Sequence, residues 1–382
     1  MRTDVERDIL ARLLAQIESP SPATLADATV PTRAYTSPER AAAERALFRR
    51  VPLAVAHASE VPEAGAFVTR DVAGFPLLLA RDEAGEVGVF ANVCRHRGTR
   101  LVDAAAGKAK AFACRYHAWT YDLRGRLTHV PHRETFPSLA QEGPGLVRMP
   151  SATRHGVVWA TLTPGAAVDA RAVLGSVIDD DFAAFGLSDH VVMDRKSERR
   201  ACNWKLVIEA FLEGYHARFL HQRTLARFFV DGGVVSDRLG ANTRSAGARK
   251  EILALEKLPP AERTVRAFAT MFYFVFPNTI VVVHPDWVSH ITMTPRAEGE
   301  STYTHTMLVP RDRVTDADRS HWRATWDLIE EKVFQTEDLS VADSIQASLA
   351  AGVDLEFRIG GLEMPIRWFH DALEEALRLE QR

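Results

Sequence analysis

The chain is organised around residues 203–221, which read NWKLVIEAFLEGYHARFLH. Good helix formers and the absence of proline predict a helix over this stretch. The ionisable residues Glu209, Glu213 and His216 follow one another at spacings of four and three, which places them on one face of such a helix. Their neighbours are mostly apolar, so we expect these side chains to be buried. Buried ionisable groups need partners or a metal ion.

His221 is the second histidine of the stretch. It comes five residues after His216, which is about 140° around a regular helix at ~100° per residue. The two imidazoles converge only if the helix unwinds or bulges after His216, as helices often do at functional sites. With one carboxylate from elsewhere they would form the facial triad of a non-haem Fe(II) oxygenase. The alternative is one core histidine and one surface histidine, and this stretch alone leaves both open.

Length and composition limit the classes of protein to consider. The chain has 382 residues, enough for a large core and, we expect, two domains. Its formal net charge of -3 offers no basic surface for nucleic acid. The sequence contains no run of about eighteen apolar residues, so no membrane span is predicted. The charged N-terminus lacks the apolar core of a signal peptide. Three cysteines are too few for a disulfide framework, so we expect a reducing cytoplasm.

Residue patterns divide the chain into an N-terminal part, residues 1–49, and two domains, residues 50–165 and 166–382. An apolar stripe predicts an amphipathic helix at residues 4–17, and Ser37-Pro38, which suits a helix cap and first turn, predicts a second helix at residues 38–49; we expect both to pack on the larger domain. In the smaller domain, short apolar runs separated by glycines and charged turns predict an all-β fold.

The pattern of the larger domain is mixed. Helical periodicity marks residues 169–185 and returns after Trp322, whereas apolar runs between residues 268 and 309 predict four strands. The polar stretch 231–250 is expected to be a mobile loop. The larger domain is therefore predicted to be α+β, with an antiparallel sheet and helices on one face.

Two pairs of cysteine and histidine lie on expected loops of the β domain. Cys94 and His96 form the first pair, and Cys114 and His117 form the second. Thiolates and imidazoles at such spacing indicate a metal site, for which zinc is the common case. Because each loop offers one cysteine and one histidine, the order favours a [2Fe–2S] centre with two cysteines on one iron and two histidines on the other. Such ligands raise the potential to roughly -150 to +300 mV, so the centre can pass electrons to an oxidising site.

These motifs resemble those of a known family. The segments CRHRG (residues 94–98) and CRYHAW (residues 114–119) are similar to the Rieske motif of the Rieske non-haem iron oxygenases. These proteins are the alpha subunits of ring-hydroxylating and demethylating systems. The segment NWK (residues 203–205), followed by Glu-x-x-His-x-x-x-x-His (residues 213–221), resembles their mononuclear iron motif. The resemblance runs over nearly the whole chain in the family's order.

The resemblance implies an all-β Rieske [2Fe–2S] domain followed by a catalytic domain in which helices pack on an antiparallel sheet, a helix-grip, START-like fold. Within the first domain, Cys94 and Cys114 would bind one iron of the cluster. His96 and His117 would bind the other.

The resemblance also implies that His216 and His221 bind the catalytic iron, together with an aspartate far downstream. Residues 335–339, QTEDL, resemble the setting of that ligand, which would be Asp338. The sequence supports Asp338 independently, because it shares one helical stripe with Phe334, Ala342, Ile345 and Leu349. Glu337 lies about 100° away on a helix and is the alternative ligand. A capping or surface role for Asp338 is the remaining alternative.

Glu213 occupies the position of the acid that links the two metal sites in this family, where ring-hydroxylating members usually carry aspartate. The resemblance implies that Glu213 bonds His216 and a Rieske histidine of a neighbouring subunit, with electrons crossing between the subunits of a homotrimer. Glutamate is also seen in members that act on quaternary ammonium compounds such as choline, betaine and carnitine. An aromatic and a quaternary ammonium substrate therefore both stay open.

The function implied by the resemblance is that of the terminal oxygenase of a multicomponent Rieske system. It would use O2, as a mono- or dioxygenase, to hydroxylate, dihydroxylate or oxidatively demethylate a small organic substrate. Electrons from NADH or NADPH would arrive through a separate flavin reductase, a ferredoxin or both. No Gly-x-Gly-x-x-Gly motif for a dinucleotide is present, which fits a separate reductase. The alternatives are a Rieske-type electron carrier without oxygenase activity and a zinc-stabilised binding protein.

Two further features concern the pocket and the third cysteine. Phe272, Phe274 and Phe276 alternate along a predicted strand and, with the tryptophans at 287, 322 and 326, either line an apolar pocket or belong to the core. Cys202 has no cysteine or histidine partner at ligand spacing, so we expect a buried structural thiol.

Overall fold

The computed structural model of the protein describes residues 1–19, 27–139, 143–259, 262–353 and 355–379. It divides into two compact units. One consists of Met1–Leu47 with Arg171–Arg382, and the other of Phe48–Ala170, so most of the N-terminal part belongs to the larger unit. These limits lie a few residues from the domain boundaries expected from the sequence. Within the described ranges, no helix is both long and apolar enough to cross a membrane.

The smaller unit is built from short antiparallel strands. A four-stranded sheet has the order β5-β4-β3-β6, and two three-stranded sheets have the orders β7-β8-β9 and β10-β11-β2. The strands are β2 (Leu53–His57), β3 (Ala66–Val72), β4 (Phe75–Arg81), β5 (Val87–Ala91), β6 (Ala106–Lys108), β7 (Phe112–Ala113), β8 (Thr120–Tyr121), β9 (Leu127–His129), β10 (Ser151–Arg154) and β11 (Val157–Ala160). Ala73 and Gly74 join β3 to β4 with φ of 50° and 75°, the left-handed conformation that a two-residue hairpin turn requires.

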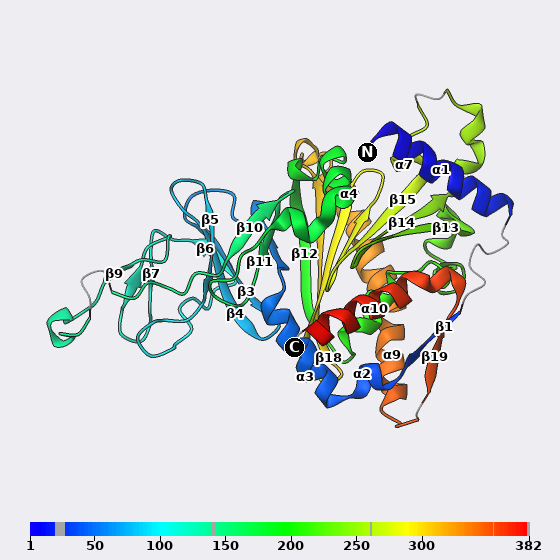
Figure 1. Ribbon diagram of the computed structural model, residues 1–382. Helices are drawn as coiled ribbons and strands as arrows, with labels where there is room; N and C mark the ends of the chain where they lie inside the picture. The colour runs from blue at the N-terminus through cyan, green and yellow to red at the C-terminus, as the bar shows by residue number, and fades with distance from the viewer. Residues whose placement is uncertain (20–26, 140–142, 260–261, 354, 380–382) are drawn as a thin grey trace. The chain divides into compact units, whose positions relative to one another are not determined.

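The larger unit is organised on a seven-stranded antiparallel sheet with the order β12-β18-β17-β16-β15-β14-β13 (Figure 1). Its strands are β12 (His190–Arg200), β13 (Phe229–Leu239), β14 (Asn242–Arg249), β15 (Ala269–Val275), β16 (Thr279–Val283), β17 (Val288–Ala297) and β18 (Glu300–Pro310). The four strands predicted between residues 268 and 309 are β15 to β18. The α+β fold class is therefore confirmed.

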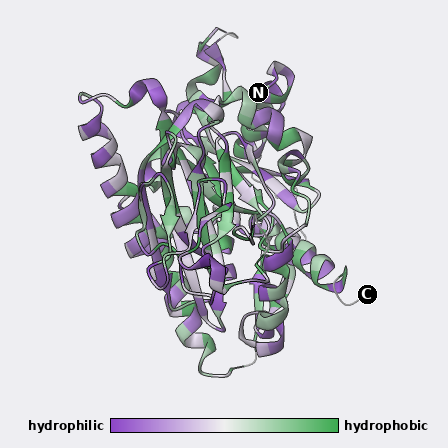
Figure 2. Ribbon diagram, turned by 90° about the vertical axis from the view of Figure 1, so that its left-hand side faces the viewer, coloured by the Kyte–Doolittle hydropathy of each residue, from purple (hydrophilic) through white to green (hydrophobic). Residues whose placement is uncertain are grey.

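The helices of this unit are α1 (Thr3–Glu18), α2 (Arg33–Thr36), α3 (Pro38–Arg50), α4 (Ala170–Ala184), α5 (Trp204–Ala210), α6 (Ala217–Leu220), α7 (Val265–Phe268), α8 (Arg319–Trp326), α9 (Leu339–Leu349) and α10 (Met364–Leu379). Those at 4–17, 38–49 and 169–185 were predicted, although Gly175, at φ 71°, interrupts α4. A small sheet pairs β1 (Ala28–Pro31) with β19 (Glu356–Ile359). Figure 2 shows hydrophobic residues along the strands and hydrophilic residues on outer turns of the helices.

Helices cover both faces of the seven-stranded sheet, not one face as the sequence suggested. On β15, Tyr273 donates a hydrogen bond to Asp181 of α4 at 3.0 Å. The next residue, Phe274, packs against Phe369 of α10 with ring centroids 5.3 Å apart. Successive strand residues point to opposite faces, so α4 and α10 lie on opposite sides. Periodicity identified each helix but carried no information about which face it covers.

The expectation of a mobile loop at residues 231–250 is wrong, because most of this stretch forms β13 and β14. The strands looked like a loop because they are polar, but the polar groups find partners inside the fold. Arg244 bonds Asp181 and Asp237, and Asn242 donates to two carbonyls of α4. A single sequence does not reveal such long-range partners.

The N-terminal helices are attached to α5 through the NWK segment. Asn203 caps α5 by accepting the N–H of Lys205 at 3.1 Å. The Lys205 ammonium is fully buried and lies 2.8 Å from Glu44 of α3, which also accepts the indole N–H of Trp204. Burial lowers the pKa of Lys205 despite this partner. The buried ion pair explains a lysine in an otherwise apolar segment and fixes the start of the helix that leads to the site.

Candidate metal centres and the adjoining pocket

Two loops of the smaller unit fold in the same way, one beginning at Cys94 after β5 and the other at Cys114 after β7. In each loop the cysteine N–H donates to the carbonyl five residues later, at 2.8 and 2.9 Å. The residue four positions after each cysteine, Gly98 or Ala118, donates back to the cysteine carbonyl. Both of these residues have positive φ, 75° and 55°. The two motifs are therefore matching tight turns, each of which carries one cysteine and one histidine.

These turns direct two thiols inward and two imidazoles toward each other. Cys94 and Cys114 are 2% and 4% exposed, and both are free thiols. The Nδ1 atoms of His96 and His117 lie 3.1 Å apart at the surface. Two buried sulfur donors and two converging ring nitrogens fit the donor set of a Rieske-type [2Fe–2S] cluster.

Two aromatic residues support this donor set. The ring of Trp119 stacks on His96 with centroids 4.8 Å apart. The Tyr121 hydroxyl accepts the N–H of Arg95 at 3.0 Å and lies 3.5 Å from Sγ of Cys94. Burial raises the pKa of Tyr121 well above its ordinary value, so its hydroxyl stays protonated and can donate to a thiolate.

Residues 203–221 of the larger unit do not form the continuous helix predicted from their composition. Helix α5 ends at Ala210, a turn follows, and α6 begins after His216. The main break therefore comes before His216, and the single turn of α6 ends at Leu220, so the chain also leaves the helix before His221 as expected. Glu213 Oε2 accepts two backbone N–H groups in the turn, including that of His216 at 3.2 Å. These side-chain bonds replace helical carbonyls, and propensity alone does not reveal them.

The break also separates the ionisable residues that were expected on one helical face. Glu209 bonds the Tyr35 hydroxyl at 3.0 Å and His370 Nε2 at 2.9 Å, and so ties α5 to α2 and α10. Glu213 instead bonds Nδ1 of His216. Each buried acid has a partner, but only Glu213 belongs to the site.

His216, His221 and Asp338 come together, with one ligand atom of each within 4.8 Å of the others. Oδ1 of Asp338 lies 3.5 Å from Nε2 of His216 and 3.3 Å from Nε2 of His221. This oxygen is buried and has no hydrogen-bond partner among the described residues. Such an oxygen is costly unless a cation binds it. Two imidazole nitrogens and one carboxylate oxygen are the donor set of a non-haem Fe(II) site, so these residues fit that metal.

Each histidine of this triad is held from behind by a carboxylate. Glu213 bonds Nδ1 of His216, and Glu337 bonds Nδ1 of His221 at 2.7 Å and accepts the Thr224 hydroxyl at 2.8 Å. Burial lowers the pKa of both histidines, but Asp338 together with Glu213 at His216, or with Glu337 at His221, outweighs it, and the net pKa lies above the ordinary value. Because the carboxylates engage the Nδ1 atoms, both Nε2 atoms face Asp338 and can bind a metal ion.

Glu337, which the sequence offered as the alternative metal ligand, instead lies behind His221 and bonds its Nδ1. The sequence signal was its position beside Asp338 but about 100° around the helix, which points the two carboxylates in different directions. We expect Glu337→Gln to keep the fold but to weaken iron binding roughly 10–100-fold, as losses of ligand-orienting contacts do. The measurement is the iron that the protein retains as the chelator concentration is raised. Glu331→Gln, at an exposed glutamate paired with Lys196, is the control, and equal retention in both variants would contradict the positioning role.

Asp338 ends a π-helix, Asp327–Asp338, which lies between α8 and α9. π-helical turns are rare and frequent at functional sites. Glu330 within it is fully buried and bonds the Tyr303 hydroxyl at 2.9 Å and His305 Nδ1 at 2.8 Å. This network fixes the π-helix to β18 and so positions Asp338. The sequence predicted a regular helical stripe here and did not reveal the wider turns.

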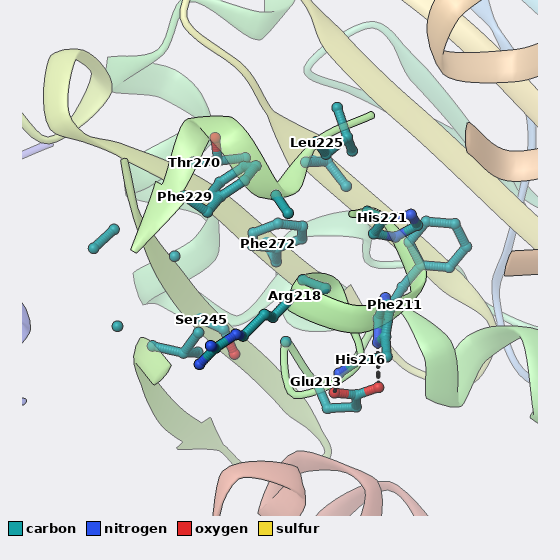
Figure 3. Close-up of a pocket in the computed structure, with 18 of the residues that line it drawn as sticks. Phe211, Glu213, His216, Arg218, His221, Leu225, Phe229, Ser245, Thr270 and Phe272 are labelled. Carbon is teal, nitrogen blue, oxygen red and sulfur yellow. Dashed lines mark hydrogen bonds and ion pairs between the residues drawn. The ribbon is translucent and has the colours of Figure 1, made fainter. Parts of the chain in front are cut away.

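A cavity of about 400 Å³ opens beside the triad. His216, His221 and Asp338 form part of its wall, and the remainder is largely apolar (Figure 3). Its aromatic residues are Phe211, Phe229, Phe272 and Phe334. The cavity is large enough for a small organic molecule and places that molecule next to the three ligand atoms.

The aromatic residues singled out in the sequence divide between this cavity and the core. Phe272 lines the cavity, whereas Phe274 packs on α10. The three tryptophans at 287, 322 and 326 are buried outside the cavity wall. Phe211 was missed as a pocket residue although it lies in the stretch 203–221, because its direction depends on the helix break.

Cys202 is fully buried, and burial raises the pKa of its thiol to about 12. Such a thiol is neither a ready nucleophile nor a ready metal ligand. We therefore expect Cys202→Ser to leave the iron content and the visible spectrum unchanged, whereas Cys114→Ser, the positive control, should lose the cluster absorption. Loss of that absorption in Cys202→Ser would contradict the structural role.

Comparison with known proteins agrees with this architecture. Residues 187–379 match the family model of the ring hydroxylating alpha subunit (catalytic domain), and residues 51–140 match that of the Rieske [2Fe-2S] domain. The chain is 31% identical to the biphenyl 2,3-dioxygenase alpha subunit of Rhodococcus jostii over 67% of its length and 54% of that protein. It is 34% identical to the glycine betaine monooxygenase oxygenase subunit of Chromohalobacter salexigens over 57% of its length and 47% of that protein. The matched regions thus span about half the length of these relatives.

The fold is shared with a quaternary ammonium Rieske monooxygenase whose solved structure concerns carnitine oxidation by gut microbiota and inter-subunit electron transfer. The TM-score is 0.77 at 22% identity, over 94% of this chain and 97% of that one. At this identity the likeness concerns the fold alone. Matched along more than half of its length, the chain belongs to the ring-hydroxylating alpha subunit family and carries a Rieske [2Fe-2S] domain ahead of the catalytic domain.

Proposed function

We propose that the chain is the terminal oxygenase of a multicomponent Rieske system that oxidises a small organic substrate with O2. The observation that carries the proposal is the buried Oδ1 of Asp338, which has no hydrogen-bond partner among the described residues and lies beside the Nε2 atoms of His216 and His221. This donor set adjoins an apolar cavity. An electron carrier that lacks oxygenase activity needs neither feature, so both favour the oxygenase.

The proposed ligands follow from the two donor sets. Cys94 and Cys114 would hold one iron of a [2Fe–2S] cluster, and His96 and His117 the other. His216, His221 and Asp338 would hold a mononuclear iron. When bound, these groups would supply single electrons and a site where O2 is activated next to the substrate. The protein itself would orient the ligands, because Glu213 and Glu337 accept hydrogen bonds from the Nδ1–H groups of His216 and His221. The phenylalanines of the cavity would exclude water.

Glu213 would also link the two kinds of centre, across neighbouring copies of the chain in a homotrimer. Its carboxylate already bonds His216, and the two side chains are 9% and 24% exposed. Exposed aromatic rings flank both motifs, with Tyr215 and Phe219 near Glu213 and Tyr116 against His117. Exposed apolar groups of this kind favour contacts between protein surfaces, which supports a joint between copies at these motifs.

The electron donor would be a separate flavin reductase, a ferredoxin or both, fed by NADH or NADPH in the cytoplasm. The relatives bear the names of an arene dioxygenase and of a betaine monooxygenase, so hydroxylation, dihydroxylation and demethylation are all compatible with family membership. The apolar cavity wall favours an apolar molecule.

The test uses pre-reduced protein mixed with heavy-isotope-labelled O2 and a panel that contains biphenyl, naphthoate, carnitine and glycine betaine. We expect at least one compound to accelerate oxidation of the cluster and to yield an oxygen-labelled product, detected by mass spectrometry. A protein that cycles its cluster but contains no third iron and labels no product would instead be the electron carrier.

A further inference from the structure

We propose that Thr270 and His284 form a polar subsite in the wall of the cavity, which binds an oxygen substituent, foremost a carboxylate, of an otherwise aromatic substrate. The inference rests on the proposed function, because it names the substrate class of that same site. It assigns the choice between an aromatic acid and a quaternary ammonium compound to these two residues.

The pairing of strands brings the two residues together. Met271 of β15 is opposite Val283 of β16, so the preceding residue, Thr270, is opposite the following one, His284. On its other side Thr270 is opposite Gly247 of β14, which has no side chain to cover it. Thr270 and Phe272 share a face of β15, and in the view of Figure 3 Phe272 lies between Thr270 and the two histidines of the triad.

Both residues carry a buried polar atom without a hydrogen-bond partner. Among the cavity-lining residues that the structure describes, such atoms are Oγ1 of Thr270, Nε2 of His284 and Oδ1 of Asp338. For Asp338 the expected partner is iron. An unmet buried hydrogen-bonding group costs roughly 1–3 kcal/mol, so the same feature at the other two atoms points to a second group that a ligand supplies.

Other polar residues of the wall already have partners. Ser245 shares a hydrogen bond of 2.8 Å with Ser236. Glu213 bonds His216, and Asp231 bonds Arg218. Apart from Asp338, which faces the proposed iron, the described acids of the cavity wall are therefore engaged by histidine or arginine, and neither is left to balance a permanent cation.

The charges around the subsite favour an acceptor oxygen. Burial, followed by the charges of His305, Arg249 and Arg266, lowers the pKa of His284 to about 3, so the ring is neutral and can donate through one nitrogen. Arg266 donates to the His284 carbonyl at 3.1 Å, and Lys250 contributes a further positive charge to the cavity wall. A carboxylate would gain from these charges, whereas a trimethylammonium group would be repelled.

The rival account is that the Thr270 hydroxyl and His284 Nε2 rotate to bond each other and bind nothing. Three probes of one ring system separate the accounts: naphthoate, naphthalene and naphthyltrimethylammonium. Their dissociation constants are measured by anaerobic equilibrium dialysis against the full-length holoprotein. Such binding needs neither turnover nor a reductase, so failure of the subsite is distinguishable from failure of the oxygenase reaction.

We expect naphthoate to bind at least about tenfold more tightly than naphthalene, as for a hydrogen bond to a charged group, and the cation to bind least. Thr270→Val and His284→Phe should each remove most of that preference while leaving naphthalene within about twofold. His284→Phe keeps a ring to stack on Trp287, which lies 3.8 Å away. Thr279→Val, the same substitution at a buried threonine of β16 outside the cavity, should keep the wild-type ranking.

Three results would overturn the proposal. The first is binding of the cation as tightly as the carboxylate by the wild-type protein. The second is an unchanged carboxylate preference in both variants, which the internal Thr270–His284 bond predicts. The third is failure of the wild-type protein to bind any of the three probes. If a variant does not fold, the order of the three dissociation constants for the wild-type protein still tests the proposal.

Discussion

His221→Ala is expected to abolish substrate oxidation and to remove about one iron atom per chain, while the visible absorption of the cluster persists. The imidazole supplies one of three ligand atoms, and Oδ1 of Asp338, 3.3 Å from it, would lose a neighbour that helps to hold the metal. The cluster ligands belong to the other compact unit, so their donor set stays intact. Iron analysis, visible spectroscopy and single-turnover product yield measure the three parts of this prediction.

The control for this variant is His321→Ala. His321 is a surface histidine of the same unit that pairs with Asp286 at 3.0 Å, and its loss should leave all three readouts at wild-type values. Full turnover with bound iron in His221→Ala would remove His221 from the site. Loss of the cluster absorption together with the iron would instead indicate that the substitution unfolds the chain.

Glu213→Gln is expected to fold and to keep both metal centres, but to deliver electrons from the reduced cluster roughly 10–100-fold more slowly. Glutamine retains an oxygen that can accept the backbone N–H groups of the turn, so the break before His216 should survive. It loses the negatively charged carboxylate that bonds Nδ1 of His216. Hydrogen bonds to charged acceptors are stronger than those to neutral ones. The loss of a contact that orients a metal ligand typically has an effect of that size.

The measurement is the rate of cluster oxidation after pre-reduced protein is mixed with O2 and substrate. Chemical reduction of the cluster should proceed at the wild-type rate, since Glu213 is not among its proposed ligands. If Glu213→Gln oxidised as fast as the wild-type protein, the carboxylate would have only a structural role in the turn. The proposed passage of electrons through this residue between copies of the chain would then fail.

The metal-binding motifs and the fold class could be predicted from the sequence because their information is local or periodic. Cys94 and His96 lie in one turn, and Cys114 and His117 in a matching one, so spacing alone brings each pair together. Apolar alternation likewise identified strands β15 to β18. Asp338 could be inferred from an apolar helical stripe, and the structure places it beside both histidines.

The remaining features depend on contacts that one sequence does not encode locally. The turn before His216 exists because Glu213 replaces helical carbonyls, and strand β14 is polar because its side chains find partners on α4 and β13. Both Glu337 and Asp338 carry a carboxylate, so residue type could not show which one is the metal ligand. The directions of their side chains in the structure do. The unpartnered atoms of Thr270 and His284 become visible only when strands far apart in the chain are paired.

The central claim, two metal centres in one chain, is tested most directly by quantifying iron and acid-labile sulfide in the protein as purified without oxygen. The account predicts three iron atoms and two sulfides per chain, together with the visible absorption of a [2Fe–2S] cluster. Two irons with two sulfides would describe an electron carrier with no mononuclear site. A colourless protein that holds zinc without sulfide would contradict both centres.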